Sequence, residues 1–591
     1  MDVTEKSAQV MRMTEIYSRA KHVRVWLGIA DRTSDDAILY LRELLSKDLI
    51  KVTRRDYMGI DSLDMLLRRA WFRRKWVIQE IAIARDVSIY CGTECLPWKD
   101  FADSFVTFTR LLRTESSISY IGEDFSRTGA NTLVYVSNNI FQRDSRGEHV
   151  IHWLVSIEAL LQRLSQFEAT DPRDVVYAVL ALAKNTYASS LIPVDYSKPV
   201  WEVYRDVIAV IVCQSQSLDI ICRPRAATAN LTWRPSWMQS HRRASFRIDE
   251  KGGVARKNAD TLVGETGRSP YRACGSSTAI ATSFDFVNHR QASNVILAEG
   301  FIIDEIGTCG TVAFNGSIPL NWFEIGGWSS TKSHPPQTFC RTLVANRDDK
   351  GDNPPAWYPR ICHRVFMNAG SSSTRYSPKD LERGSKDAPM ALEFIKRLHA
   401  TIWNRRFGKT AINQAPGLFP AGAQIGDLIR VLYGCSVPVV MRKKQDLSTA
   451  QLNYLIEPDM DWKRPEPLLG VNIEPYITKL RSIYAKQGAN WDDGMEKDNI
   501  IFAAEDTNKK ILDSYQKSPP RRKNTDIKKA AEENGSNISA GKALSYEKER
   551  LAKIDFECTL IGECFMYGVM DGEAMELTRS GGVEPIMFGI W

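Results

Sequence analysis

The apolar positions of the first hundred residues alternate between helical and strand spacing. Between Glu5 and Ala20 they recur at helical intervals, which predicts an amphipathic helix. The segment HVRVWLGI at 22–29 is short and rich in β-branched and aromatic residues, and this favours a buried strand. Helices are predicted over 31–45 and 63–84, and a second strand over 86–91. This alternation predicts an α/β unit with one shared core, formed by Met13, Ile16, Tyr17, Val25, Leu27, Trp76 and Ile81.

The middle of the chain has helical spacing. In DPRDVVYAVLALA, Asp171 as N-cap, Pro172 at N1 and Asp174 at N3 suit the free amides of a first turn. A second helix follows SKP, where apolar residues from Val200 to Ile211 form one stripe. Both segments predict core helices.

After about residue 270 the apolar period changes toward two, which predicts an antiparallel sheet or small barrel. We expect GFIIDEIG, GDLIRVLYG, VPVVMR and LIGECFMYGVM to pair in it although an insertion separates Arg442 from Phe556. The cost of closing a loop grows only logarithmically with its length, so the insertion barely penalises this pairing.

Composition shifts suggest the domain boundaries. We expect an α/β domain at 1–110, a helical region at 111–240, a β-rich module at 270–445 with 556–591, and an insertion at 446–555. Within the insertion, residues 507–553 are polar, basic and poor in aromatic residues, which is typical of disorder. The basic run Lys517–Lys529 is either a nuclear-import signal or a solvated linker.

Charge and cysteine content exclude several classes of protein. The 591 residues contain 78 Lys and Arg against 71 Asp and Glu, a net charge of +7, so nucleic acid is not an expected partner. The 11 cysteines are dispersed and odd in number, which indicates a reduced intracellular protein. No apolar run approaches the roughly 18 residues of a bilayer span, so we expect no membrane contact and a cytoplasmic location.

One predicted helical face carries a carboxylate. Helical spacing places six residues on this face: Arg73, Trp76, Val77, Glu80, Ile81 and Ala84. Burial would raise the pKa of Glu80, whereas a nearby guanidinium would lower it. A structural ion pair between Glu80 and Arg73 or Arg74 is the plain alternative to a functional role.

No metal or nucleophile motif accompanies that carboxylate. Cys91 and Cys95 form C-x3-C without a second pair, so zinc would require distant His or Cys to converge, and buried thiols are the simpler interpretation. HExxH, GxSxG and EF-hand patterns are absent from the sequence. We therefore predict no bound metal and no resident cofactor.

Eight motifs in one order resemble the fungal heterokaryon-incompatibility (HET) domain family and the sequences that usually follow this domain. They are EKSAQVMRMTEIYSRAKHVRVWLG, WFRRKWVIQEIAIARDVSIYCG followed by Trp98, DPRDVVYAVLALA, VDYSKPVWEVYRDV, LTWRPSW, GFIIDEIG, GDLIRVLYGCSVPVVMR and LIGECFMYGVMDGEAM. HET domains usually open with blocks like SYxWG and WIDAxCINQ. This chain begins where the second block would end, so we expect the first strand, first helix and second strand to be missing, through an incomplete gene model or a degenerate copy.

The resemblance implies a fold and a candidate residue. The HET domain is considered similar to the TIR fold, a parallel flavodoxin-like sheet, so the expected class is a truncated TIR-like α/β half-domain, a helical middle and an antiparallel β module. In TIR enzymes that cleave NAD, a Glu follows a Trp on the helix after the third strand. Trp76 and Glu80 occupy the comparable place, so Glu80 would bind the nicotinamide ribose of NAD as substrate.

Three functions stay open on the sequence alone. The chain is a HET-family factor in non-self recognition and programmed cell death, with unidentified protein partners and the capacity to oligomerise. Alternatively, it is a TIR-like NAD-cleaving enzyme, or a degenerate interaction protein without activity. An absent first βα unit argues against the enzyme, because that unit forms one wall of the cleft in such folds. In-frame SYxWG-like and WIDAxCINQ-like blocks upstream of Met1 would restore the enzyme hypothesis.

Overall fold

The computed structural model describes one compact unit of the chain, Met1–Ser448 together with Glu549–Trp591. The second unit, Thr449–Lys548, lies outside the described residues, as do the whole predicted insertion and the Lys517–Lys529 run. The subdivision predicted inside the first unit stays a prediction. The described residues are 2–46, 54–114, 128–143, 150–183, 192–223, 245–248, 254–277, 285–289, 292–328, 333–369, 374–383, 385, 388–443, 556–576 and 585–590.

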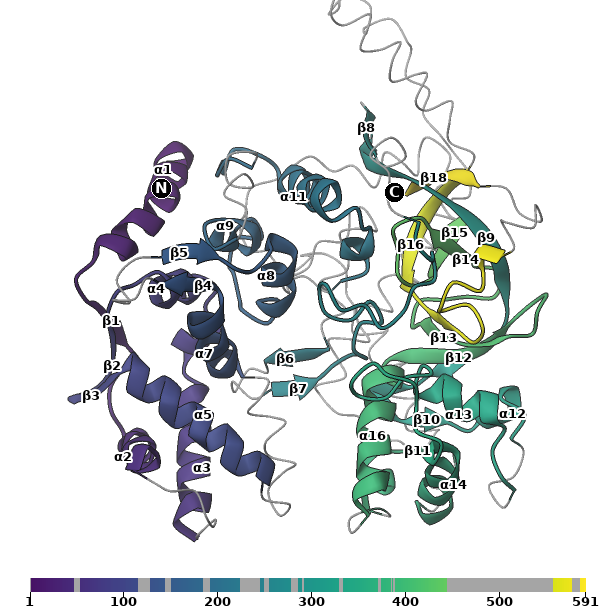
Figure 1. The fold of residues 1–591 in the computed structure, drawn as a ribbon, viewed down its shortest axis with the longest axis horizontal. Helices are drawn as coiled ribbons and strands as arrows, with labels where there is room; N and C mark the ends of the chain where they lie inside the picture. The colour runs from purple at the N-terminus through teal and green to yellow at the C-terminus, as the bar shows by residue number, and fades with distance from the viewer. Residues whose placement is uncertain are drawn as a thin grey trace, which may run out of the picture. The chain divides into compact units, whose positions relative to one another are not determined.

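The N-terminal part joins a small sheet to helices (Figure 1). Strand β1 (Val23–Trp26) pairs in parallel with β2 (Val87–Cys91), and β2 pairs antiparallel with β3 (Glu94–Pro97). Parallel strands need a long crossover. The elements around the strands are α1 (Val3–Arg19), α2 (Arg32–Ser46), α3 (Arg54–Leu67), η1 (Ala70–Arg73), α4 (Val77–Ala82) and α5 (Trp98–Thr114). The predicted alternation of helix and strand is therefore confirmed.

Most of the predicted N-terminal core is confirmed. Val25, Leu27 and Ile81 are buried, and Tyr17 and Trp76 pack partly buried against the same core. Helix α1 contributes no fully buried residue, and the Ile16 side chain is 54% exposed, so the prediction for Ile16 is wrong. Adjacent residues of a helix point about 100° apart, so the helix that turns Tyr17 inward turns Ile16 outward.

The helix predicted over 63–84 is wrong as one continuous element. Helix α3 ends at Leu67, η1 follows, and α4 begins only at Val77. Between η1 and α4 the backbone is extended and bonds to a distant segment: Lys75 donates its amide to the Glu168 carbonyl over 2.8 Å, and the Glu168 amide donates to the Arg73 carbonyl over 2.7 Å. These long-range bonds replace the local bonds of a helical turn.

The middle of the chain is mainly helical, as predicted. Its elements are α7 (Gly129–Asn139), β4 (Phe141–Arg143), β5 (Val150–Trp153), α8 (Ile157–Arg163), α9 (Asp174–Leu180), α11 (Val200–Ser215) and η2 (Asp219–Ile221). The apolar stripe of α11 is buried, because Val203, Val207 and Ile211 all lie in the core. Residues 224–244, which include the LTWRPSW motif, lie outside the described part.

The C-terminal part contains a nine-stranded sheet built around β9. Its strands are β8 (Asp285–His289), β9 (Ala292–Val312), β12 (Arg405–Thr410), β13 (Pro416–Pro420), β14 (Leu428–Leu432), β15 (Val439–Lys443), β16 (Phe556–Glu563), β17 (Phe565–Met566) and β18 (Ile586–Ile590). The predicted pairing is confirmed: β14 lies between β9 and β15, and Met441 of β15 faces Leu560 of β16. One pair, β16 with β18, is parallel, which the sequence did not predict.

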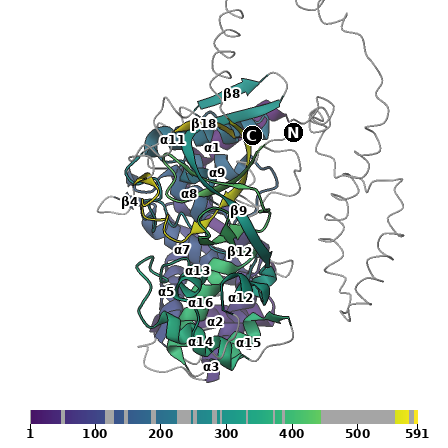
Figure 2. The ribbon, with the colours of Figure 1, turned by 90° about the vertical axis from the view of Figure 1, so that its right-hand side faces the viewer.

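A group of helices between β9 and β12 was not predicted. These helices are α12 (Asn321–Ile325), α13 (Gln337–Leu343), α14 (Tyr358–Asn368), α15 (Pro378–Arg383) and α16 (Pro389–Ile402). Helices α12, α13 and α16 lie beside β12 in both views (Figures 1 and 2). The module is therefore a mixture of helix and sheet rather than the β-rich unit that was expected. Two further two-stranded sheets are present in the described part. Strand β6 (Phe246–Ile248) pairs with β7 (Val254–Arg256), and β10 (Ile318–Pro319) pairs with β11 (Arg375–Tyr376).

The helices of the described part are short. α1 and α5 have 17 residues each, and both carry charged side chains. No helix within the described ranges has the length and apolar character that crossing a membrane requires.

Candidate functional site

Glu80 lies on the first turn of α4, next to the 3-10 turn η1 and helix α1. Because α4 starts at Val77, Arg73 belongs to η1 and does not share a helical face with Glu80. The side chain of Trp71, in η1, is hydrogen-bonded to the Glu80 carboxylate. Tyr17 of α1 lies close enough to respond to the Glu80 charge. Three elements therefore surround this carboxylate.

The electrostatics of Glu80 agree with the opposing effects expected from the sequence. Burial raises the pKa of Glu80, and the positive charge of Arg74 and the hydrogen bond with Trp71 offset only part of that rise. Burial also raises the pKa of the Tyr17 hydroxyl, and the negative charge of Glu80 raises it further. The site therefore holds a carboxylate that takes up a proton more readily than a solvated one.

The structure supports only part of the alternative in which Glu80 forms a structural ion pair with Arg73 or Arg74. Among the described residues, no ion pair joins Glu80 to Arg73 or Arg74; Arg73 instead reaches Glu168, with 3.8 Å between Nη1 and Oε1. Arg74 acts on Glu80 through its charge. The role in binding NAD that the resemblance suggests stays a prediction.

A second cluster forms where the DPRD motif turns into α9. The α-helix begins at Asp174 with Arg173 at the N-cap position, so the prediction that Asp171 is its direct N-cap is wrong. Asp171 still caps the preceding turn: its Oδ1 accepts from the Arg173 amide over 3.0 Å, and its carbonyl accepts from the Asp174 amide over 3.0 Å. The Arg173 side chain also bonds Asp171, with 2.9 Å between Nε and Oδ1.

Motifs that are far apart in the sequence meet at this cluster. Lys6 of α1 forms an ion pair with Asp171, with 3.1 Å between Nζ and Oδ2, and its Nζ lies 3.7 Å from the centre of the Tyr196 ring. The indole of Trp76 donates to Oδ2 of Asp174 over 3.2 Å, and the Tyr196 hydroxyl donates to Oδ1 of Asp174. The EKSAQ, WFRRKWVIQE, DPRD and VDYSKP motifs thus form one polar network.

Within this network, the direction of each pKa shift depends on the groups that bond to the side chain. Burial raises the pKa of Asp174, and its hydrogen bond from Tyr196 and the charge of Lys6 offset that rise only in part. Asp171 is also desolvated, but hydrogen bonds and charge from Arg173 and a bond from Lys6 hold its pKa below the ordinary value. Burial and the bond to Asp174 raise the pKa of Tyr196, so this hydroxyl keeps its proton at neutral pH. The network therefore keeps Asp171 as a carboxylate and the Tyr196 hydroxyl protonated.

Sequence reasoning missed this network. It treated DPRDVVYAVLALA only as a core helix, gave Asp174 a role only in the first turn of that helix, and assigned no role to Lys6 or Tyr196. The sequence did contain a signal for a polar network, because charged residues stand directly before apolar runs in these motifs. The motifs had been used only for their order along the chain. The distances between motifs gave no indication that these motifs meet.

The C-x3-C pair lies on adjacent strands. Cys91 is fully buried on β2, and Cys95 on β3 faces Tyr90. Within the part of the chain that the structure describes, no three His, Cys, Asp or Glu side chains gather as a metal site would require. All eleven cysteines are free thiols.

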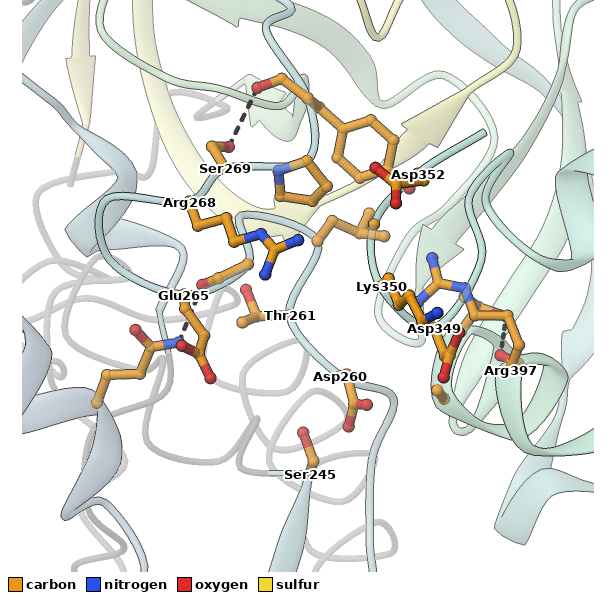
Figure 3. A pocket seen from close by; sticks show the side chains of 18 of the residues that line it. Ser245, Asp260, Thr261, Glu265, Arg268, Ser269, Asp349, Lys350, Asp352 and Arg397 are labelled. Carbon is orange, nitrogen blue, oxygen red and sulfur yellow. Dashed lines mark hydrogen bonds between the residues drawn. The ribbon is translucent and has the colours of Figure 1, made fainter. Parts of the chain in front are cut away.

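A polar cavity of about 940 Å³ lies elsewhere in the first unit (Figure 3). Figure 3 shows Glu265 on one side of it, Asp349 and Arg397 on another, and the Arg268 side chain between them; Gln162 also lines the cavity. Hydrogen bonds hold some of the lining residues in place. Gln162 donates to the Gly264 carbonyl over 3.0 Å, and Arg397 Nε donates to the Arg347 carbonyl over 3.0 Å. Neither Glu80 nor Asp174 lines this cavity, so it is separate from the predicted site.

Comparison with known proteins identifies the N-terminal segment. Residues 1–80 match the family described as heterokaryon incompatibility protein (HET). A stretch of 239 residues is 26% identical to heterokaryon incompatibility protein 6, OR allele, of Neurospora crassa, and covers 33% of this chain and 34% of that protein. The chain thus matches about a third of that relative's length. No solved structure matches the chain.

These findings concern the N-terminal segment of the chain. Its N-terminal segment is related to proteins of heterokaryon incompatibility, and the matched residues contain α1, β1, α2, α3, η1 and the start of α4. The resemblance to the HET family seen in the motifs is confirmed over residues 1–80, where the family model matches.

Proposed function

We propose that this protein acts in heterokaryon incompatibility in a fungus, where it takes part in non-self recognition and in programmed cell death signalling. The observation that carries the proposal is the HET match over residues 1–80, together with a relative that is named for incompatibility. Its partners are other proteins, and it works in the cytoplasm or in the nucleus. The function requires no resident cofactor.

The polar network supports a role for residues beyond the matched segment. Lys6 and Trp76 lie inside the matched segment, whereas Asp171, Asp174 and Tyr196 lie outside it. A change at the helical region is therefore transmitted to α1 and α4 through direct bonds. This arrangement suits a protein in which the later regions regulate the HET segment.

Inducible expression in a filamentous fungus tests the proposal. Growth and cellular NAD content are measured after induction of the wild type and of a Tyr196→Phe variant, which removes the hydroxyl bonded to Asp174. We expect growth to fall in the wild type and to recover in the variant. Arg12→Ala, an exposed change on α1, is the matched control and keeps the wild-type effect. Unchanged growth at verified expression of the wild type would exclude a cell-death role in that host.

A second candidate, a TIR-like NAD-cleaving enzyme, is favoured by Glu80. Its carboxylate is half-buried and its pKa is raised, and α4 belongs to the connection between the parallel strands β1 and β2, as it would in half of a flavodoxin-like sheet. In this proposal NAD is the substrate and Glu80 contacts its nicotinamide ribose. NAD hydrolysis by the purified chain, lost in Glu80→Gln with an unchanged melting temperature, would support the enzyme.

A further inference from the structure

Buried arginines hold one wall of the polar cavity in place. This wall is formed by residues 260–270, which contain no helix or strand of their own. Each of three buried arginines donates to a backbone carbonyl of the segment: Arg223 to Gly264, Arg347 to Pro270 over 3.0 Å, and Arg405 to Asp260 over 2.9 Å. None of the three arginines lines the cavity itself. The wall therefore has a fixed position that regular secondary structure does not provide.

Carboxylates complete this support. Each of the three arginines is paired with one: Arg223 with Glu158 over 2.8 Å, Arg405 with Glu563 over 2.7 Å, and Arg347 with Asp571. Glu563 also accepts from the Leu262 amide and from the Thr261 hydroxyl, each over 2.9 Å. Buried ion pairs add little net stability, because both charges lose their water. Their effect here is to fix the cavity wall, as the supporting residues of a binding site do.

A tight loop at residues 348–352 forms another part of the lining. Asp348 Oδ1 accepts the amide of Lys350 over 2.9 Å and the amide of Asp352 over 2.8 Å. Gly351 has a positive φ of 86°, and a Cβ built on it would lie 3.3 Å from Cβ of Pro270. The loop therefore packs against the supported wall, and the two parts of the lining position each other.

Arg268 is presented to the cavity by a turn. Its amide donates to the Glu265 carbonyl over 3.0 Å, and Gly267 has the positive φ of 81° that the third position of such a turn requires. The Arg268 side chain extends between the two sides of the cavity (Figure 3). Within the described ranges this guanidinium forms no hydrogen bond or ion pair, so all its donors are available to a ligand.

Positive charge is in excess among the lining side chains that lack a charged partner. Four cations and four carboxylates line the cavity. Two of the carboxylates are neutralised by arginines outside the lining, Asp260 by Arg256 over 2.9 Å and Glu265 by Arg163 over 3.2 Å. In the part that the structure describes, no ion pair involves the four lining cations, which are Arg268, Arg272, Lys350 and Arg397. With two carboxylates left, the cavity has an excess of two positive charges.

We propose that this cavity binds a small molecule that carries a phosphate group and several hydroxyl groups. A phosphate group has nearly two negative charges at neutral pH, which matches the excess, and guanidinium groups bind it with two parallel hydrogen bonds. The remaining carboxylates, Asp349 and Asp352, accept hydrogen bonds and so suit the hydroxyl groups. A volume of about 940 Å³ is that of a small-molecule site. A sugar phosphate has this combination of groups.

Isothermal titration calorimetry on the full chain tests the proposal with ribose 5-phosphate, inorganic phosphate and ribose as probes. We expect one site for ribose 5-phosphate, weaker binding of inorganic phosphate, and no binding of ribose, because the phosphate group supplies the charge. Arg268→Gln removes a charge-assisted bond and should weaken both phosphate-bearing probes about tenfold or more. Arg268→Lys keeps the positive charge and should weaken them less.

A second variant separates the two halves of the ligand. Asp349→Ala should weaken ribose 5-phosphate and leave inorganic phosphate at least as tightly bound, because it removes an acceptor for hydroxyl groups and a negative charge. Arg12→Gln, which removes an exposed cation on α1 outside the lining, is the matched control and keeps the wild-type affinities. Melting temperatures accompany every sample, so a loss of binding is interpreted only where the variant is folded.

Three results would overturn the proposal. Absence of binding of both phosphate-bearing probes to the wild type at millimolar concentration rejects the site. Binding that the double variant Arg268→Gln, Lys350→Gln leaves unchanged also rejects it, because the phosphate group then binds elsewhere. Equal affinity of the wild type for ribose 5-phosphate and inorganic phosphate rejects the role given to the hydroxyl groups.

Discussion

Lys6 and Asp171 stand 165 positions apart in the chain, and their side chains form an ion pair with 3.1 Å between Nζ and Oδ2. This contact joins α1, which has no buried side chain, to the turn that starts α9. A helix without buried residues depends on its polar contacts and on partly buried groups such as Tyr17. The position of α1 is therefore sensitive to single polar substitutions.

Lys6→Ala should loosen α1. The pair is partly exposed, so we expect a loss of only about 0.5–1 kcal/mol in the free energy of unfolding. Amide hydrogen exchange should rise across Val3–Arg19 and stay unchanged in α11. Lys21→Ala, at an exposed position after the helix, is the control. Equal exchange in Lys6→Ala and the control would show that the ion pair does not hold the helix.

Asp174 and Tyr196 should be strongly coupled. Both are buried and the hydroxyl donates to the carboxylate, so removing one partner leaves the other without its bond. A double-mutant cycle with Asp174→Ala and Tyr196→Phe, measured by urea denaturation, should give a coupling energy of about 1–3 kcal/mol. Effects that add to within about 0.3 kcal/mol would contradict the network.

Asp219 should make stability depend on pH. Burial raises the pKa of Asp219 to about 6, although the Ser436 amide donates to its Oδ1 over 2.7 Å and Arg223 lies nearby. The folded pKa is above the unfolded one, so this group's contribution is full below about pH 4 and is lost as pH rises through about 6. Between about pH 5 and pH 7, the free energy of unfolding should fall by roughly 1–2 kcal/mol from this group.

Asp219→Asn tests the origin of this pH dependence. Asparagine keeps an oxygen acceptor for Ser436 and cannot ionise, so the slope attributed to Asp219 should disappear. Urea denaturation at several pH values measures the difference between wild type and variant. The same slope in both proteins would assign the pH dependence to other groups.

The purified chain should show no measurable NAD cleavage. The Glu80 carboxylate already accepts a bond from Trp71 and lies beside Tyr17 and Arg74, so the protein's own groups occupy its surroundings. Glu80→Ala should therefore change stability and leave no activity to lose. Release of nicotinamide from NAD is the readout. Robust release that Glu80→Ala abolishes would contradict this prediction and favour the enzyme.

Local patterns predicted the elements, and long-range bonds decided where those elements stop. The strands at 22–29 and 86–91 and the α11 stripe follow from side-chain spacing and were found correctly. The break between η1 and α4 depends on Glu168, about ninety positions further on, and no local pattern contains it. Helices α12, α13 and α15 were missed because they have only five to seven residues, which gives little periodic signal. Helices α14 and α16 have 11 and 14 residues, and the prediction of a β-rich module overlooked their helical spacing.

The candidate site was predictable only in part. Glu80 was selected because a carboxylate interrupts an apolar pattern, and the opposing effects on its pKa were foreseen, whereas its functional role stays a prediction. The bonds of Asp174 to Trp76 and Tyr196 were not predicted from the sequence, because they link three segments whose contact depends on the whole fold. The order of the motifs indicated the HET family, whose model matches residues 1–80, but it contained no information about which residues touch.

Growth after inducible expression in a filamentous fungus tests the central claim most directly. The account predicts that the wild-type chain reduces growth, that Tyr196→Phe restores it at equal expression, and that cellular NAD stays constant in both. Constant growth with the wild-type chain expressed would contradict a role in incompatibility signalling. Growth loss with falling NAD would contradict the signalling account as well, and would assign the effect to enzymatic cleavage.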